Sequence, residues 1–320
     1  MSSATALRTP LRLLAQKARA RGILTAYATH LRHARRRFRR DGQSAHGALD
    51  RLGDLGARVC EPGTLDNGLE LGPHYDALAR RLADDVSARF ELTRECTMFP
   101  AVTSRLLPER VEDVAEIRAG ECISLQLKEY VDLTALPELA AEVVRELETK
   151  IYGAYVIVDK VYVYRNLVTR QAPQVSWLWH YDNHPNEISK VMIYLTDVSD
   201  TTAPFEFLAA ERSGQALSLA PAPLVGTSRL APDTLERYVA QGYRSRRVTG
   251  KAGTLILFDN NIAHRANVAT EGHRDVLVLQ VRPATFRPVS PLDRRWTGSF
   301  VHVDFNPNPY LYRPRLKRPA

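Results

Sequence analysis

Apolar residues recur every three or four positions through much of the first 150 residues, which is the spacing of amphipathic helices. The pattern runs through residues 11–31, 74–92 and 137–151. The last of these segments begins with Pro137, a residue suited to a first helical turn. The sequence therefore predicts a mainly helical N-terminal part.

The pattern changes near Gly153, where apolar residues begin to alternate or to form short β-branched blocks. The predicted strands are 155–167, 174–180, 190–196, 205–208, 254–258, 262–267 and 275–281. An irregular insertion, 214–251, contains a predicted helix at 230–238, and an insertion of that length between strands often builds a lid or a binding wall. Many short strands separated by Pro and Gly are typical of a closed or double-sheet antiparallel architecture.

These changes divide the chain into four parts, and together they predict an α+β fold. We expect a basic helix or arm, a mainly helical region packing on the core, a β core that carries the insertion, and a C-terminal extension. Their bounds are 1–45, 46–152, 153–290 and 291–320.

The formal charge of +8 is concentrated at the N-terminus. Residues 1–40 hold eleven basic and no acidic side chains, whereas the remainder holds 33 basic and 36 acidic ones. Three interpretations stay open: a basic surface helix or frayed arm, a helix on an anionic membrane or nucleic-acid surface, and an organelle-targeting peptide. Arg12 interrupts the apolar stretch that a secretory signal would need, and no run approaches the roughly 18 apolar residues of a membrane span.

The rest of the composition is ordinary for a soluble globular protein, with 44% hydrophobic and 25% charged residues. The three cysteines, Cys60, Cys96 and Cys122, are far apart and form no C-x-x-C pair. This pattern argues against a disulfide framework and a cysteine zinc site, and it favours a reducing, cytoplasmic compartment.

The strongest chemical signal is His180-Tyr181-Asp182 followed much later by His264. Residues i and i+2 of a strand point to the same side, so His180 and Asp182 can present both donors to one metal. A sheet edge could bring His264 to the same ion. Two imidazoles and a carboxylate are the donor set of non-haem Fe(II) oxygenases. His184 is an alternative ligand, although Pro185 turns the chain there.

Arg274 follows His264 by ten residues and opens the apolar strand 275–281. One interpretation is an ordinary surface ion pair. The other is a clamp on the distal carboxylate of 2-oxoglutarate, because a planar guanidinium matches a carboxylate with two parallel hydrogen bonds.

At these positions the chain resembles the Fe(II)/2-oxoglutarate-dependent oxygenases, and within them the phytanoyl-CoA dioxygenase-like group. The resemblance covers roughly residues 155–285, a little under half of the chain. Its motifs are WHYDN (179–183), KVMIYLTDV (190–198), APFEFL (203–208), GTLILFDNNIAHRAN (253–267) and RDVLVLQVRP (274–283).

The resemblance implies a double-stranded β-helix, or jelly-roll, core of cupin-like type. It implies His180, Asp182 and His264 as catalytic iron ligands and Arg274 as the 2-oxoglutarate clamp, with Lys190 and Tyr164 as further cofactor contacts. The chain departs from the pattern at AAERSG (209–214), where relatives often carry Gly-Ser-His. That loop often shapes the substrate pocket, so no relative's substrate is carried over.

The expected activity is that of a dioxygenase that hydroxylates a C–H bond of a small molecule with release of succinate and CO2. The expected partners are therefore O2 and a small-molecule metabolite, with anionic, lipid-like and secondary metabolites as the classes considered. No specific nucleic acid is expected, and residues 1–40 are the candidate for contact with an anionic membrane. A basic cluster, Arg244, Arg246, Arg247 and Lys251, is either a solvated loop or a rim that attracts an anionic substrate.

Two other functions remain open. A non-enzymatic jelly-roll binding protein would bind metal weakly or not at all. A cupin-type metal-dependent hydrolase or isomerase would use zinc or manganese and would ignore 2-oxoglutarate.

Overall fold

The computed structural model describes residues 3–62, 69–91, 96–100, 109–110, 122–127, 129–170, 172–173, 175–220 and 228–299. The predicted C-terminal extension falls outside these ranges beyond residue 299. Within them, two antiparallel sheets with helices outside them form the protein, which confirms the predicted α+β fold with a double-sheet, jelly-roll core. The two sheets do not join into a closed barrel.

The larger sheet has nine strands in the described chain and the order β1-β9-β6-β11-β5-β4-β2-β3, with β12 beside β5. All of its pairings are antiparallel except β12 with β5. In chain order its strands are β1 (Ala57–Cys60), β2 (Cys96–Pro100), β3 (Glu109–Arg110), β4 (Cys122–Leu127), β5 (Tyr155–Leu167), β6 (Ser189–Tyr194), β9 (Leu255–Asp259), β11 (His273–Ala284) and β12 (Gly298–Ser299).

The smaller sheet has the order β10-β7-β8. Its strands are β7 (Phe205–Ala210), β8 (Tyr243–Val248) and β10 (His264–Ala266). An apolar cluster joins it to the larger sheet and includes Phe205, Phe207, Phe258 and Val278. Apolar side chains therefore fill one part of the space between the two sheets, and another part is open as a cavity.

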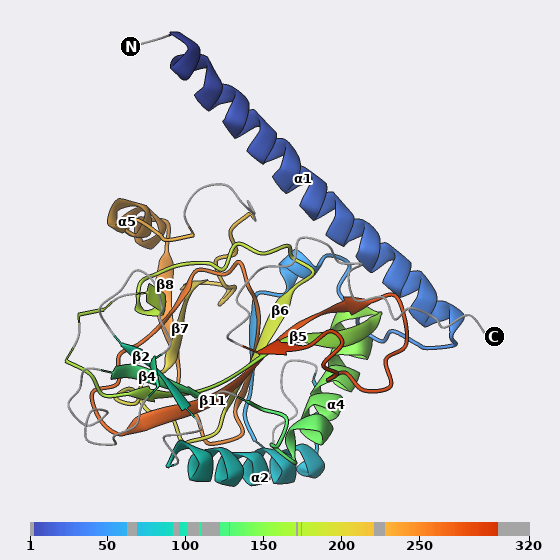
Figure 1. Ribbon diagram of the computed structural model, residues 1–320, viewed down its shortest axis with the longest axis vertical. Coiled ribbons are helices and arrows are strands. Elements are labelled where there is room, and N and C mark those ends of the chain that lie inside the picture. The colour runs from blue at the N-terminus through green and yellow to red at the C-terminus, as the bar shows by residue number, and fades with distance from the viewer. Residues whose placement is uncertain are drawn as a thin grey trace.

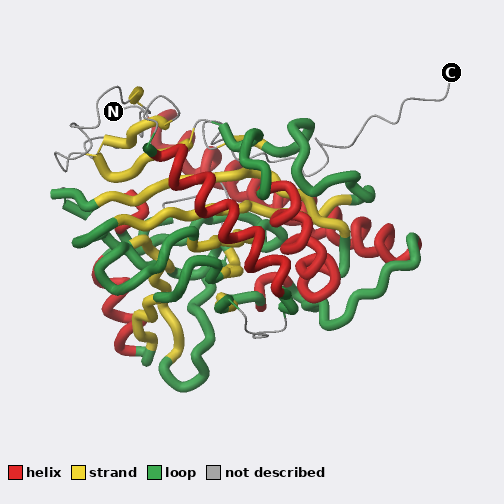
Figure 2. The backbone as a smooth tube through the Cα atoms, turned by 90° about the horizontal axis from the view of Figure 1, so that it is seen from below, coloured by secondary structure: helices red, strands yellow, loops and turns green. Residues whose placement is uncertain are grey.

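Helices cover the opposite face of the larger sheet. They are α2 (Pro73–Phe90) and α4 (Leu136–Leu147), which continues into the π-helical turn η3 (Glu148–Tyr152). Alternation along β11 explains this arrangement, because Leu277 and Leu279 join the helix-side core while Val276 and Val278 join the cluster between the sheets. Figure 2 shows helices lying across the strands.

The N-terminal helix α1 (Ser3–Arg40) packs by one stripe against the body, and Figure 1 shows its N-terminal end projecting beyond it. The buried stripe contains Ile23, Tyr27, Leu31 and Phe38, while the basic side chains that follow Lys17 lie at least partly exposed. The segment is thus helical, and its contact with an anionic surface remains a prediction. None of the helices in the described part of the chain has the length and apolar character needed to span a bilayer.

The secondary structure differs from the sequence prediction in three places. Residues 46–152 contribute β1, β2, β3 and β4 as well as helices, and the insertion 214–251 contributes β8. Residues 174–180, predicted as a strand, instead contain the 3-10 turn η4 (Val175–Trp177). Of the added strands, β1, β4 and β8 pair with partners distant in sequence, so a short local pattern did not reveal them. The predicted helix at 230–238 is α5 (Pro232–Ala240).

We expect Leu277→Ala to lower the free energy of unfolding by about 2–5 kcal/mol, since it deletes a fully buried side chain in a central strand. Urea unfolding followed by circular dichroism measures this. Val289→Ala removes a side chain that is 98% exposed and serves as the control, with no measurable change expected.

Candidate metal and co-substrate site

A cavity of about 340 Å³ opens between the two sheets. The larger sheet supplies its floor through alternate residues of β5 and β11, because period-two alternation places every second side chain on this face. The six side chains that the sequence singled out all line this cavity: Tyr164, His180, Asp182, Lys190, His264 and Arg274. The structure thus brings them together, and their chemical roles remain predictions.

A backbone bridge sets the two histidines side by side. His180 N donates to His264 O at 2.9 Å, and His264 N donates to His180 O at 2.8 Å. Their ring centroids lie 4.3 Å apart. Asp182 is held by the same edge, since its N–H donates to Asn260 O at 2.8 Å, and the left-handed Asn183 (φ 58°) then turns the chain away.

Both imidazoles are oriented by backbone carbonyls. Nδ1 of His180 lies 2.8 Å from Leu178 O, and Nδ1 of His264 lies 2.9 Å from Ile262 O. These bonds place the proton on Nδ1 and leave each Nε2 lone pair directed into the cavity, as in metal-ligating histidines.

The Nε2 atoms face the carboxylate of Asp182. The distances are 4.0 Å from His180 Nε2 to Asp182 Oδ1 and 3.8 Å from His264 Nε2 to Asp182 Oδ2. One donor atom from each residue lies within 4.8 Å of the other two, and this is the group of three that the described residues offer to a metal ion. Spacing and donor chemistry both fit one divalent cation with open coordination positions.

The protonation states also suit a metal. Burial, together with the neighbouring His264, lowers the pKa of His180 to about 3, so its imidazole is neutral at pH 7. Burial opposes ionisation of Asp182, but Lys190 and both histidines hold the pKa of that carboxyl below its ordinary value. Lys190 Nζ donates to Asp182 Oδ2 at 2.7 Å. Lys190 is therefore a neighbour of a predicted ligand as well as a wall of the cavity.

Arg274 is the largest fully buried side chain of the described protein. None of its three guanidinium nitrogens makes a hydrogen bond of normal length and angle to a described residue. The Tyr194 side chain interacts with it electrostatically, and the ring of Tyr194 lies 5.9 Å from Cζ. An isolated buried cation is strongly unfavourable, so this position is suited to an anion supplied from outside the chain. A carboxylate accepting two parallel N–H bonds fits it.

His184, the alternative ligand, also lines the cavity but does not belong to the group of three. Its Nδ1 lies 3.2 Å from Asn260 Nδ2, and its backbone N–H donates to Asn261 Oδ1 at 3.2 Å. Burial lowers its pKa to about 4. The interaction with Asn260 engages Nδ1, so the structure places His184 beside the candidate site as a wall residue.

The sequence prediction missed several polar side chains of the cavity floor. Lys160, Tyr162 and Asn166 project from β5 beside Tyr164, and Gln280 projects from β11. A signal was present, because polar residues at 160, 162, 164 and 166 interrupt an apolar strand at every second position and so share one face.

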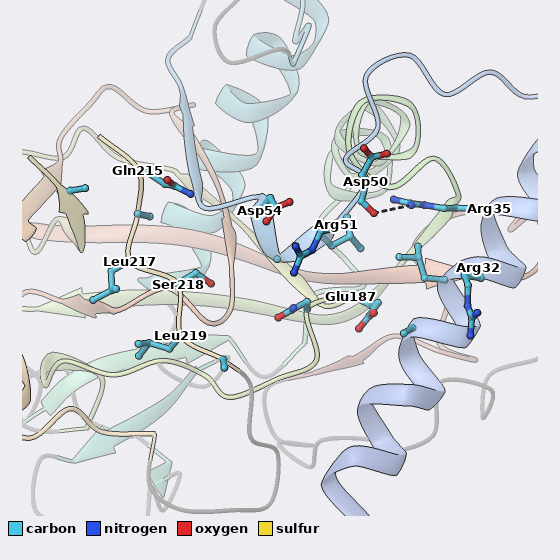
Figure 3. Close-up of a pocket in the computed structure, with 18 of the residues that line it drawn as sticks. Arg32, Arg35, Asp50, Arg51, Asp54, Glu187, Gln215, Leu217, Ser218 and Leu219 are labelled. Atoms are coloured by element: carbon cyan, nitrogen blue, oxygen red, sulfur yellow. Dashed lines mark hydrogen bonds between the residues drawn. The ribbon is translucent and has the colours of Figure 1, made fainter. Parts of the chain in front are cut away.

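A second cleft, of about 800 Å³, lies between α1, the 3-10 turn η1 (Leu52–Asp54) and the segment 215–220 (Figure 3). Although larger, it contains no group of three metal-ligating side chains among the residues described. Arg35, which lines it, donates to the backbone carbonyls of Leu49, Asp50 and Tyr152. These contacts attach α1 to the body. Because the described residues of this cleft contain no metal-ligating group of three, the candidate site is the cavity between the sheets.

Glu187 in this second cleft predicts a pH-dependent stability. Burial raises its pKa to about 7, with Arg35 opposing and Asp259 adding to the shift. Because the folded-state pKa exceeds the ordinary one, the stabilising protonation is fully present below about pH 4.5 and is lost as pH rises through 7. Relative to Glu187→Gln, the wild type should lose up to about 3 kcal/mol between pH 4.5 and 8. Urea unfolding of both proteins across this range measures the difference, and parallel curves would contradict it.

Comparison with known proteins gives a partial picture. No protein-family model matches the chain, and no curated protein matches it. Solved structures that resemble it include EctD from S. alaskensis (TM-score 0.45, 15% identity, 75% of this chain and 80% of that one) and AviO1 from Streptomyces viridochromogenes (0.40, 15%, 76% and 99%). HygX from Streptomyces hygroscopicus is a third (0.39, 15%, 72% and 84%).

Some of these structures carry ligands. One EctD structure holds Fe and another holds 2-oxoglutarate with 5-hydroxyectoine, while HygX holds nickel, 2-oxoglutarate and hygromycin B. With TM-scores below 0.5 and identities near 15%, the likeness transfers none of these ligands to the present chain. The narrower resemblance to phytanoyl-CoA dioxygenases likewise stays a prediction.

Proposed function

We propose that this protein is an Fe(II)- and 2-oxoglutarate-dependent oxygenase acting on a small molecule. The observation that carries the proposal is that one cavity holds both a set of metal-donor atoms and a buried guanidinium, each suited to a ligand from outside the chain. Three neutral or anionic donors converge there, and a fully buried guanidinium without a described hydrogen-bond partner lines the same space. A metal ion and a dicarboxylate complete both features together.

His180, Asp182 and His264 would hold Fe(II), and Arg274 would hold the distal carboxylate of 2-oxoglutarate. When bound, the iron and co-substrate supply an O2-derived oxidant strong enough to attack a C–H bond, with release of succinate and CO2. The protein itself orients the metal ligands and excludes water from the site. Backbone carbonyls fix the two imidazoles, and the aromatic side chains of Phe205 and Phe258 border the ring of His264.

Lys190 has a further task in this proposal. Its ammonium group lies 2.7 Å from Asp182 Oδ2, so it keeps the carboxyl ionised and orients it toward the two Nε2 atoms. Tyr164 lines the cavity on the strand next to Arg274 and would contact the co-substrate. Hydroxylation of the substrate is the outcome that we propose for the oxidising step.

The test is succinate formation from 2-oxoglutarate by protein loaded anaerobically with Fe(II) and then exposed to O2. The assay follows 2-oxoglutarate and succinate, so it is set up without knowledge of the substrate. We expect iron-dependent succinate formation that stops when a chelator is added. Tight binding of zinc with no response to 2-oxoglutarate would instead favour a cupin-type hydrolase or isomerase, and failure to bind any metal would favour a binding protein.

A further inference from the structure

One side of the N-terminal helix α1 is fastened to the body of the protein. The residues of this buried line are Ala20, Ile23, Tyr27, Leu31, Ala34 and Phe38. The ring of Phe38 packs edge-on against Tyr155 at 5.0 Å between centroids, and Arg35 Nε donates to Tyr152 O at 2.8 Å. These contacts fix the orientation of the helix, so its opposite side is held toward solvent.

The solvent side of α1 is strongly basic. Its exposed basic side chains are Lys17, Arg19, Arg21, Arg32, Arg36, Arg37, Arg39 and Arg40. Within the described chain only Arg37 of this set forms an ion pair, with Asp41 at 2.9 Å, and residues 1–40 contain no acidic side chain. Like charges four residues apart on a helix, such as Arg32, Arg36 and Arg40, destabilise it. This side of the helix is therefore suited to an anionic partner.

The line opposite the buried one changes character along the helix. Positions 7, 11, 14, 18, 22, 25, 29, 32, 36 and 40 follow one another at steps of three and four, so they share one side. They lie about half a turn from the buried line, since two residues of a helix span roughly 200°. In order they are Leu, Leu, Leu, Ala, Gly, Thr, Thr, Arg, Arg and Arg. This outward line thus begins apolar, continues through small uncharged residues and ends in arginine.

The apolar end of the outward line belongs to the part of α1 that extends away from the body. Among the residues of α1 whose side chains are described, Ala20 is the first that is buried. Figure 1 shows the helix continuing from there past the body to its N-terminal end. Helices that combine leucine with many basic residues in this way are typical of the interface of a bilayer, where both kinds of side chain find a partner.

We propose that the outward line of α1 docks on the surface of an anionic phospholipid bilayer. Its leucine end enters the boundary between headgroups and acyl chains, and Arg32, Arg36 and Arg40 bind lipid phosphates, which match a planar guanidinium with two parallel hydrogen bonds. A nucleic acid would attract the same arginines but has no apolar layer for leucine, so the composition of the line favours a bilayer. This interaction is separate from the proposed function.

The test is flotation of the full-length protein with two kinds of vesicle, one of phosphatidylcholine alone and one of equal parts of phosphatidylcholine and phosphatidylserine. We expect binding to the anionic vesicles and little binding to the neutral ones. The combined change Arg32→Gln, Arg36→Gln and Arg40→Gln should weaken binding to the anionic vesicles by about 100-fold, because each basic residue at such a surface contributes roughly fivefold.

A second variant tests the apolar end without changing the charge. Replacing the leucines at positions 7, 11 and 14 by Gln should weaken binding to the anionic vesicles by about tenfold or more, because the apolar area that enters the bilayer is lost. The matched control for charge is Arg244→Gln, Arg246→Gln and Arg247→Gln, which removes three exposed arginines from β8 and should leave binding as in the wild type.

Labelled duplex DNA, titrated at the same ionic strength, distinguishes the other kind of polyanion. The proposal is overturned if the wild type does not bind the anionic vesicles, if the leucine variant binds them as the wild type does, or if the β8 variant loses as much affinity as the α1 arginine variant. Tighter binding of duplex DNA than of anionic vesicles would also overturn it and would assign this side of α1 to nucleic acid. Thermal unfolding of each variant confirms that it is folded.

Discussion

Asp182→Asn is expected to abolish iron retention and iron-dependent succinate formation. The substitution keeps the size of the side chain but removes the negative charge that balances Lys190 and draws a cation to the two imidazoles. Loss of a supporting residue around a metal already costs 10–100-fold in affinity, so loss of the charged ligand should weaken iron binding by about 100-fold or more. Iron content after anaerobic dialysis, with succinate measured in parallel, gives the result.

The protein offers a matched control for this substitution. Asp197 accepts from Lys251 at 2.7 Å, the same distance as in the Asp182–Lys190 pair, but this pair lies on the surface. Asp197→Asn should leave iron content and succinate formation unchanged, because exposed ion pairs contribute about 0–1 kcal/mol. An Asp182→Asn protein that kept its iron and consumed 2-oxoglutarate as fast as wild type would remove the assignment of all three ligands.

Arg274→Met should have two opposite effects. It should raise the 2-oxoglutarate concentration for half-maximal turnover by about 100-fold or more, since breaking a buried charge pair costs about 3–5 kcal/mol. Without 2-oxoglutarate it should stabilise the protein, because the wild type buries a guanidinium that makes no described hydrogen bond. Thermal unfolding with and without 2-oxoglutarate, in anaerobic metal-loaded protein, measures both effects.

Arg165 provides the contrast. It lies on β5, next to β11, but on the helix side of the sheet, where Nε and Nη2 donate to the two carboxylate oxygens of Asp275 at 2.7 and 2.8 Å. Arg165→Met removes both guanidinium hydrogen bonds from that buried carboxylate and leaves His273 Nε2 3.8 Å away, and it should destabilise the protein by about 3–5 kcal/mol with or without 2-oxoglutarate. If Arg274→Met were equally destabilising and 2-oxoglutarate still stabilised it, Arg274 would be a structural residue.

The local pattern of apolar and polar residues predicted much of the secondary structure. The predicted strand 155–167 has the same bounds as β5, and the strands predicted near 190, 205, 254 and 275 correspond to β6, β7, β9 and β11. Several of these strands, such as β9 and β11, pack both faces against apolar clusters and therefore read as short apolar blocks bounded by turn residues. The strands β1, β4 and β8 were missed since they form by pairing with β9, β5 and β7, which are remote in sequence. Their stability comes from partners that no short window contains.

For the candidate site, too, some features could be predicted from the sequence and others required the tertiary structure. The sequence alone determined the chemistry: a His-x-Asp pair, a lone histidine, and an arginine ahead of an apolar strand. Only the tertiary structure decided that the bridge between His180 and His264 brings their rings together, that Arg274 is wholly buried, and that Lys160 lines the same cavity. Residue type and spacing fix what a side chain can bind, whereas burial and distance arise from sheet pairing between segments far apart in the chain.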